Sequence, residues 1–471
     1  MHRTVLPAVA ISLLLCTPAT GQPLAAGGLR EALTKLVDNH PTARRTTVCL
    51  KVVDLETGEV LYDRGGDRLL VPASNLKIYT TACALDRFGP DRRFETKLQI
   101  RGEMVASALT GEIVLVGGGD AMLSTAALGK LADWVAKEAG VRKLVGRVRA
   151  DQSRYASPLK GPGWMWDDEP DYYNMSVTPL MLDFNVLRVR LESSAGGKPT
   201  ARLVPPASYP PLSWSHQAGS ANSWIDREPF TDAFLLSNPS SLESSLEERV
   251  TMDDPSPWIE SVFKHQLQPR VIEIEHADHS RVLPFVSEHS RPGASLAETV
   301  KHFNRVSENA VGEVLLHELA IDAGREQPAW SAGASVISDW LVGVAGLERG
   351  SFRLVDGSGL SRYNLISADS SIRLLQYMHK HPTSSVFYEA LPKYGVEVAA
   401  PSDSENKEER IAAKPGGMSS VSTISGYADT LGGRRLAFSL LTNGYIGSNR
   451  PVIDLRGKVW QTLVRYRPSD Q

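Results

Sequence analysis

Two residues near the start of the chain have the types and the spacing of a catalytic pair. A serine hydroxyl is a weak nucleophile by itself and needs a nearby base. In Ser74-Asn-Leu-Lys77 the lysine amine can be that base, because residues three apart lie on one face of a helix. Pro72 stands just ahead of the motif and an apolar run follows it, so the sequence predicts a helix over 74–87. The alternative is an ordinary helix start with a solvated lysine.

A second Ser-x-x-Lys pattern, Ser157-Pro-Leu-Lys160, is a decoy. Chance alone produces about one or two such pairs in a chain of this length. Pro158 and the following Gly161-Pro-Gly163 prevent this stretch from being helical, so its serine and lysine are not expected to act together.

Two further motifs follow in an order that strengthens the first candidate. Ser307-Glu308-Asn309 stands just before an amphipathic helix that begins at 310, and Lys414-Pro-Gly-Gly417 precedes a predicted strand pair over 423–441. The trio resembles Ser-x-x-Lys, Ser-Asp-Asn and Lys-Thr-Gly, the motifs of serine enzymes that react with penicillin. A second Ser-Glu-Asn copy, at 404–406, lies in a charged stretch and is expected to be a solvated loop.

Composition limits the class of protein. The 471 residues are 42% hydrophobic and 22% charged with a net charge of −3, which excludes wholesale disorder and the basic surface of a nucleic-acid-binding protein. The three cysteines support neither a disulfide framework nor a zinc site. Cys49 and Cys83 could pair or remain buried thiols, and the sequence leaves both open.

The first residues resemble a secretory signal peptide. His2 and Arg3 precede an apolar run over 5–15, and Ala19-Thr-Gly21 supplies small residues for cleavage before Gln22. No later stretch reaches the ~20 apolar residues of a membrane-spanning helix. We therefore expect an exported chain with no integral membrane segment after cleavage.

Hydrophobic periodicity predicts mixed helix and sheet at both ends and a β-rich middle. The stretch 199–258 is rich in proline and serine and predicts a small module of short strands and loops. The other predicted elements are helices over 29–40, 126–139 and 452–464 and strands over 47–53, 60–63, 423–428 and 435–441.

With these motifs in place, the sequence resembles the class C low-molecular-mass penicillin-binding proteins, the D-alanyl-D-alanine carboxypeptidase/endopeptidase family. Further resemblance lies in four segments: Pro72–Lys77, Gly117–Asp120, Gly161–Asp167 and Asp356–Asn364.

The resemblance implies an α+β penicillin-binding-protein-like transpeptidase domain, an antiparallel sheet flanked by helices, with β-rich inserted accessory domains. The 230 positions between Lys77 and Ser307 fit such insertions. The expected signal peptide covers residues 1–21, and the expected catalytic domain covers 22–94 and 288–471. An inserted domain is expected over 95–190 and 251–287, with a nested β-rich domain over 191–250.

By position, the resemblance implies an acyl-enzyme on Ser74. Lys77 is the base, and burial and the neighbouring cation Lys414 are expected to lower the pKa of its amine. Lys414 supplies positive charge for the terminal carboxylate of the substrate. Ser307 relays a proton to the leaving D-alanine, and Asn309 orients Lys77.

The backbone N–H groups of Ser74 and Gly417 form the implied oxyanion hole. Arg362, Asp151 and Gly416 are the expected substrate contacts, and the alternative for Arg362 is a pairing with a local carboxylate. The implied partners are peptidoglycan stem peptides and β-lactams, in the periplasm or another extracytoplasmic space. The resemblance implies no metal and no organic cofactor.

One departure concerns the third motif, where Pro415 and Gly417 stand in place of the family's two threonines. Proline offers neither a hydroxyl for the substrate carboxylate nor an N–H for the sheet, and it is tolerated at sheet edges. The alternative function is therefore a catalytically impaired, peptidoglycan-binding relative on the same fold. A β-lactamase is disfavoured by the long insertion.

Overall fold

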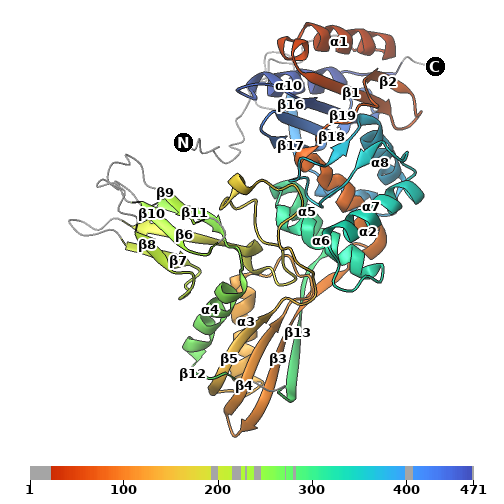
Figure 1. Ribbon diagram of the computed structural model, residues 1–471. Coiled ribbons are helices and arrows are strands. Elements are labelled where there is room, and N and C mark those ends of the chain that lie inside the picture. Colours follow the sequence, from red (N-terminus) through yellow and green to blue (C-terminus); the bar gives the residue numbers. More distant parts are fainter. Residues whose placement is uncertain are drawn as a thin grey trace.

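The computed structural model describes residues 23–192, 200–214, 224–228, 231–237, 246–270, 272–278, 283–397 and 407–468 (Figure 1). The predicted signal peptide and the second Ser-Glu-Asn copy lie outside these ranges. Among the described helices, none combines the length and the apolar composition that crossing a bilayer requires.

A six-stranded antiparallel sheet forms the upper part of the molecule in Figure 1, in the order β16-β17-β18-β19-β1-β2. One face packs on α1 (Ala26–Asn39) and α10 (Arg450–Val464), and buried aliphatic side chains fill this interface. The strands are β16 (Lys393–Glu397), β17 (Lys407–Met418), β18 (Val421–Asp429), β19 (Arg435–Asn443), β1 (Thr47–Asp54) and β2 (Val60–Arg64).

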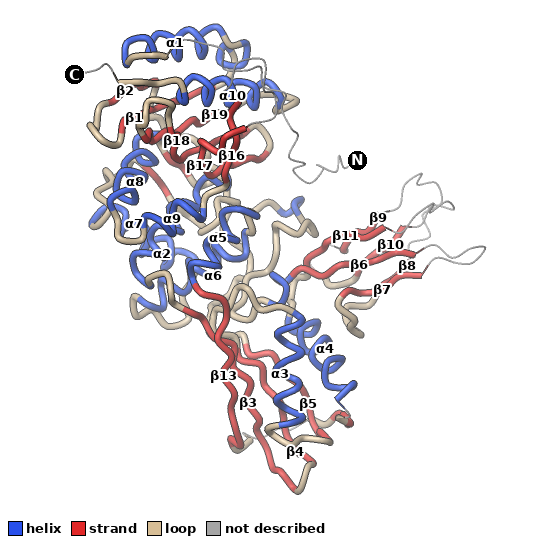
Figure 2. Tube along the Cα trace, turned by 180° about the vertical axis from the view of Figure 1, so that it is seen from behind, coloured by secondary structure: helices blue, strands red, loops and turns tan. Residues whose placement is uncertain are grey.

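A layer of helices covers the opposite face of this sheet and shares a second core with it (Figure 2). The short 3-10 turn η2 (Ala73–Leu76) leads directly into α2, so the helix predicted over 74–87 is present with a tighter first turn. Two buried cysteines, Cys49 and Cys83, are free thiols in this region. The helices are α2 (Lys77–Phe88), α5 (Leu296–Val306), α6 (Asn309–Asp322), α7 (Trp330–Gly343), α8 (Ala368–Lys380) and α9 (Ser384–Ala390).

A five-stranded sheet extends from the helical layer, in the order β12-β5-β4-β3-β13. Two helices, α3 (Thr125–Lys137) and α4 (Ser256–Leu267), pack on it around a third core. Strand β5 pairs in parallel with β4 and with β12. Strand β3 pairs antiparallel with β4 on one side and with β13 on the other. The strands are β3 (Arg93–Val105), β4 (Ala108–Val116), β5 (Lys143–Asp151), β12 (Glu273–His276) and β13 (Phe285–Ser295).

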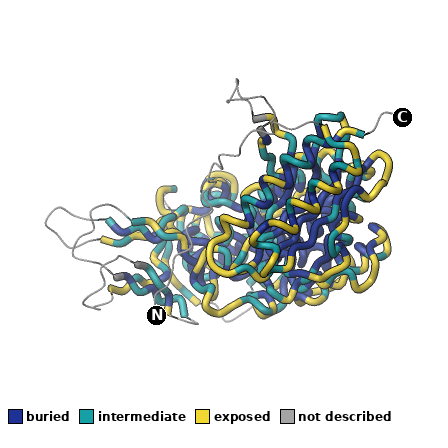
Figure 3. The backbone as a smooth tube through the Cα atoms, turned by 90° about the horizontal axis from the view of Figure 1, so that it is seen from above, coloured by how far each residue is buried: buried dark blue, intermediate teal, exposed yellow. Residues whose placement is uncertain are grey.

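Two three-stranded sheets, in the orders β11-β6-β7 and β8-β10-β9, are built from β6 and from strands of the proline- and serine-rich region. In Figure 3 the buried residues gather in the main body, whereas these sheets carry more intermediate and exposed positions. The division of the chain into domains stays a prediction. The strands are β6 (Val186–Glu192), β7 (Thr200–Val204), β8 (Leu212–Trp214), β9 (Trp224–Arg227), β10 (Phe234–Ser237) and β11 (Leu246–Thr251).

Candidate active site

Ser74 lies in the η2 turn, and its hydroxyl is 3.0 Å from the amine of Lys77. The preceding residue, Ala73, has a φ of 48°, a left-handed conformation that costs a residue with a side chain about 1–3 kcal/mol. The backbone of Gly359 packs so closely on the carbonyl of Ala73 that it leaves no room for a side chain. The surrounding loops therefore hold the turn that presents the serine.

Lys77 is fully buried, and its amine contacts three oxygen atoms. Besides the Ser74 hydroxyl, they are Oδ1 of Asn309 at 2.7 Å and the carbonyl of Ser358 at 2.9 Å. Burial lowers the pKa of Lys77 to about 8, and the nearby carboxylates of Glu313, Asp356 and Glu308 oppose that shift.

Ser307 connects α5 to α6 in a left-handed conformation, with a φ of 68°. Its hydroxyl lies 2.9 Å from the amine of Lys414, which is itself buried. Burial lowers the pKa of Lys414, and the positive charge of Lys77 lowers it further. The first serine–lysine pair is thus joined to a second pair, Ser307 and Lys414, through the Ser-Glu-Asn segment.

Strand β17 packs directly on the turn that carries Ser74. The side-chain amide of Asn75 donates to the carbonyl of Lys414 at 2.6 Å. A methyl group on Gly416 would lie 2.6 Å from the backbone nitrogen of Asn75, so glycine is required for this close approach. Gly416 is buried against the turn, and its predicted contact with substrate stays a prediction. Gly417 is exposed, and the space beside it is open.

Pro415 lies where β17 has one neighbouring strand among the described residues. Strand β16 pairs with β17 only as far as Ala412, whereas Pro415 faces Ile424 of β18. This is the edge position at which a proline does not interrupt a sheet.

The connection between β5 and β6 also reaches the site. The side-chain amide of Asn309 donates to the carbonyl of Tyr173 at 2.9 Å. Trp164 donates from Nε1 to the carboxylate of Asp356 at 3.1 Å and packs edge-to-face on Trp330. The Tyr173 contact could not be predicted from the sequence, because a backbone carbonyl is present in every residue.

The two charged substrate-contact candidates have local partners. Arg362 donates to the carbonyl of Ser419 at 3.3 Å. Burial raises the pKa of Asp168, and the positive charge of Arg362 opposes that rise. Asp151 accepts from Ser153 and pairs with Arg149 at 3.3 Å, and both partners hold its pKa low. The carboxylate near Arg362 is therefore that of Asp168, and a contact between Asp151 and substrate stays a prediction.

The decoy pair is not helical in the structure. Lys160 donates to the carbonyl of Asn174 and pairs with Glu169 at 3.3 Å instead of contacting Ser157. Burial lowers the pKa of Lys160 to about 8, as it does for Lys77. A lowered lysine pKa is therefore not specific to the Ser74 site.

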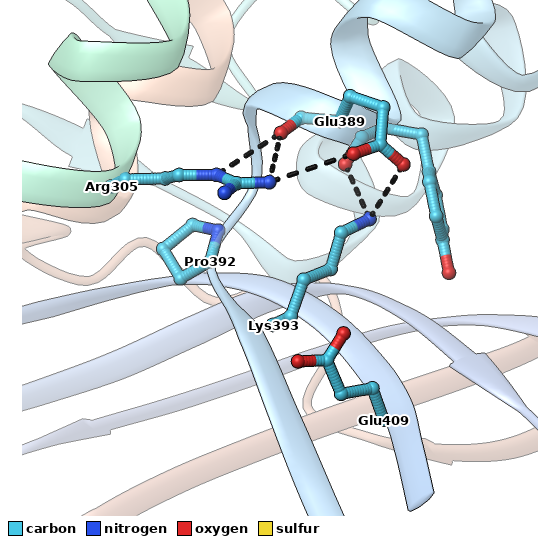
Figure 4. Close-up of a pocket in the computed structure, with 6 residues that line it drawn as sticks. Arg305, Glu389, Pro392, Lys393 and Glu409 are labelled. Carbon is cyan, nitrogen blue, oxygen red and sulfur yellow. Dashed lines mark hydrogen bonds and ion pairs between the residues drawn. The ribbon is translucent and has the colours of Figure 1, made fainter.

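A pocket of about 460 Å³ lies beside the end of α5 (Figure 4). Arg305 donates to the carbonyl of Glu389 at 2.8 Å, and Lys393 pairs with the carboxylate of Glu389 at 3.6 Å. These contacts tie α5 to α9 and β16 just before Ser307, so the pocket residues support the position of that serine.

Comparison with known proteins places these residues in a family. A model of the D-Ala-D-Ala carboxypeptidase 3 (S13) family matches residues 29–461. The chain belongs to this family. The match confirms the predicted class, serine-type D-Ala-D-Ala carboxypeptidases that bind penicillin, and does not favour the non-catalytic alternative.

Individual relatives match over most of their length. A D-alanyl-D-alanine carboxypeptidase of Actinomadura sp. is 29% identical over 470 residues, covering 94% of this chain and 86% of the relative. The D-alanyl-D-alanine carboxypeptidase DacB of Haemophilus influenzae is 21% identical and covers 88% of this chain and 90% of its own. The crystal structure of penicillin binding protein 4 from Haemophilus influenzae has a TM-score of 0.75 at 20% identity, covering 93% of this chain and 99% of that one. The predicted fold class is thereby confirmed.

Proposed function

We propose that this chain removes the terminal D-alanine from peptidoglycan stem peptides, or cleaves their cross-links, through an acyl-enzyme on Ser74, and that β-lactams acylate the same hydroxyl. The observation that carries the proposal is the 3.0 Å contact between Ser74 and the buried amine of Lys77.

The partners of Lys77 fit a neutral amine acting as base. A neutral amine has two N–H bonds and one lone pair. Asn309 Oδ1 and the carbonyl of Ser358 accept the two N–H bonds, because neither oxygen has a hydrogen to donate. The lone pair is left for the hydroxyl of Ser74, which donates its proton as its oxygen attacks the carbonyl of the penultimate D-alanine.

The second pair completes the reaction cycle. Ser307, held 2.9 Å from Lys414, passes a proton to the nitrogen of the leaving D-alanine as the peptide bond breaks. Backbone N–H groups of Ser74 and Gly417 stabilise the oxyanion, a contribution of about 3–4 kcal/mol per donor in other enzymes. Water then hydrolyses the Ser74 ester and releases the shortened peptide.

Substrate recognition follows from the groups around this centre. Lys414 attracts the terminal carboxylate, and Arg362 grips an acidic group on the stem peptide. Asp151 remains a further proposed contact. The enzyme works outside the cytoplasmic membrane after its signal peptide is removed, and an amino terminus at Gln22 in the mature protein would support that proposal.

Labelling with a fluorescent penicillin tests the nucleophile. The wild type should carry one covalent label, and Ser74→Ala should carry none. Ser157→Ala, in the decoy motif, is the matched control and should label like the wild type. An unlabelled wild type, or a label that survives Ser74→Ala, contradicts the proposal.

A further inference from the structure

A buried carboxylate, Glu313, lies on α6 one turn after Asn309 and is not used in the proposed reaction. It is completely inaccessible to solvent. Its two oxygens each accept one backbone N–H, from Gly357 at 2.7 Å and from Ser358 at 2.9 Å. Both donors belong to the loop between β14 (Phe352–Arg353) and β15 (Leu365–Ile366).

Ser358 connects this carboxylate to the catalytic lysine. Its N–H donates to Glu313, and its carbonyl accepts from the amine of Lys77 at 2.9 Å. A single residue therefore spans the distance from the buried acid to the base. A shift of Ser358 would remove one of the two acceptors that orient the Lys77 amine.

Close packing holds the same loop against its neighbours. A methyl group on either Gly312 or Gly357 would collide with the backbone of the other residue, so the loop lies directly on α6. Thr80 donates to the carbonyl of Gly357 at 2.7 Å. The two ends of the peptide unit between Gly357 and Ser358 are thus fixed by Thr80 and Glu313.

Asp356 secures the remainder of the loop. Its carboxylate accepts from the backbone of Gly359 and Ser361 and from the side chains of Asn364 and Trp164, at 2.6–3.1 Å. Four N–H donors occupy the acceptor positions of an ionised carboxylate. Asp356 therefore holds the remainder of the loop without Glu313. The role left for Glu313 is to orient the backbone of Ser358.

Several charged groups face Lys77. Glu308 and Glu313 come from the start of α6, Asp356 from the loop, and Lys414 from β17. Burial raises the pKa of Glu313, and the negative charge of Asp356 adds to that rise. The two backbone N–H donors, one on each oxygen, oppose that rise because they stabilise the ionised form.

We propose that Glu313 is a positioning residue for acylation, which through Ser358 aims the amine of Lys77 so that its lone pair faces Ser74. This inference rests on the proposed function. Because Glu313 is completely buried, it acts without touching substrate.

The test is the pH profile of acylation by a fluorescent penicillin, measured on the full mature chain. Glu313→Gln sets an amide N–H against one of two backbone N–H donors, and an unsatisfied buried donor is expected to lower the plateau rate about tenfold. Loss of the negative charge also lowers the pKa of Lys77 further. The acid limb, the part of the profile in which the rate rises with pH, should therefore move to lower pH by about one unit. Glu313→Asp keeps the charge and should show a reduced plateau with an unmoved limb.

Glu318→Gln is the matched control on the same helix. Glu318 is also buried, but it accepts from Arg154 and Tyr155 and not from the loop that contacts Lys77. Its variant should melt at a lower temperature and acylate normally per folded molecule, with an unmoved limb.

Three results would overturn the inference. The first is a Glu313→Gln profile that matches the wild type. The second is that Glu313→Gln and Glu318→Gln both lose acylation rate only in proportion to the fraction of protein that remains folded. If Glu313→Gln does not fold, a wild-type plateau in Glu313→Asp is the third. A wild type that no penicillin labels at any pH refutes the proposed function instead.

Discussion

The rate at which penicillin acylates Ser74 should rise with pH as Lys77 loses its proton. Only the neutral amine accepts the serine proton, and burial places the pKa of Lys77 at about 8. The neutral fraction is then about 1% at pH 6, about 9% at pH 7 and about 50% at pH 8. Acylation should therefore increase about tenfold from pH 6 to pH 7 and level off above about pH 9.

The assay follows acylation by a fluorescent penicillin under single-turnover conditions from pH 5.5 to pH 9.5 at constant ionic strength, with circular dichroism to show that the chain remains folded. Lys77→Met should abolish acylation over the whole range. Lys160→Met is the control, because Lys160 also has a pKa lowered to about 8 and contacts no catalytic group that the structure describes. It should leave both the rate and the limb unchanged.

Three outcomes would contradict this prediction. A rate that is flat from pH 6 to pH 8 would mean that the amine carries no proton in this range or is not needed. A limb near pH 10.5, the ordinary value for lysine, would mean that burial does not lower the pKa in solution. If the rise of the rate with pH disappears in Lys160→Met, the titrating group is Lys160 and not Lys77.

Three further predictions concern the strand and the loop beside Ser74. Gly416→Ala should lower the acylation rate at least about tenfold, because the added methyl group overlaps the carbonyl of Pro72. Gly417→Ala places its methyl group in open space and should keep most of the rate. Equal rates in the two variants would contradict this packing. Pro415→Thr should raise kcat/KM on a D-Ala-D-Ala peptide about fivefold by supplying a hydroxyl for the carboxylate, and an unchanged value would refute that role. Arg362→Gln should raise KM about tenfold for a peptide with an acidic side chain and leave a neutral peptide unaffected, and equal effects on both would rule out the contact.

Much of the fold was predictable because its strands and helices have clear hydrophobic periodicity. The strands predicted over 423–428 and 435–441 lie within β18 and β19, and the helix predicted over 126–139 corresponds to α3. The decoy motif was excluded for a physical reason that holds in the structure, since Gly161 and two prolines break the helix that it would need. The mixed parallel and antiparallel order of the five-stranded sheet was not predictable, because strand order depends on contacts between distant segments.

The side chains of the candidate site were predictable, but the backbone groups around them were not. Ser74, Lys77 and Asn309 carry chemistry in their residue types, and their motifs stand in a recognisable order. The carbonyls of Ser358 and Tyr173 cannot be recognised in this way, because every residue has a carbonyl and only the fold directs these two at the site. Gly416 shows the same limit, because its close packing on the Ser74 turn joins distant segments and could not be predicted from the sequence.

The contact between the Tyr173 carbonyl and Asn309 restricts how this protein can be shortened. A minimal enzyme assembled from the six-stranded sheet and its helices would retain every residue of the three motifs. It would nevertheless lack the oxygen that receives the Asn309 amide, leaving that side chain free to rotate away from Lys77. The long insertion between the first and second motifs therefore cannot simply be deleted. A shortened version must supply another acceptor for the Asn309 amide.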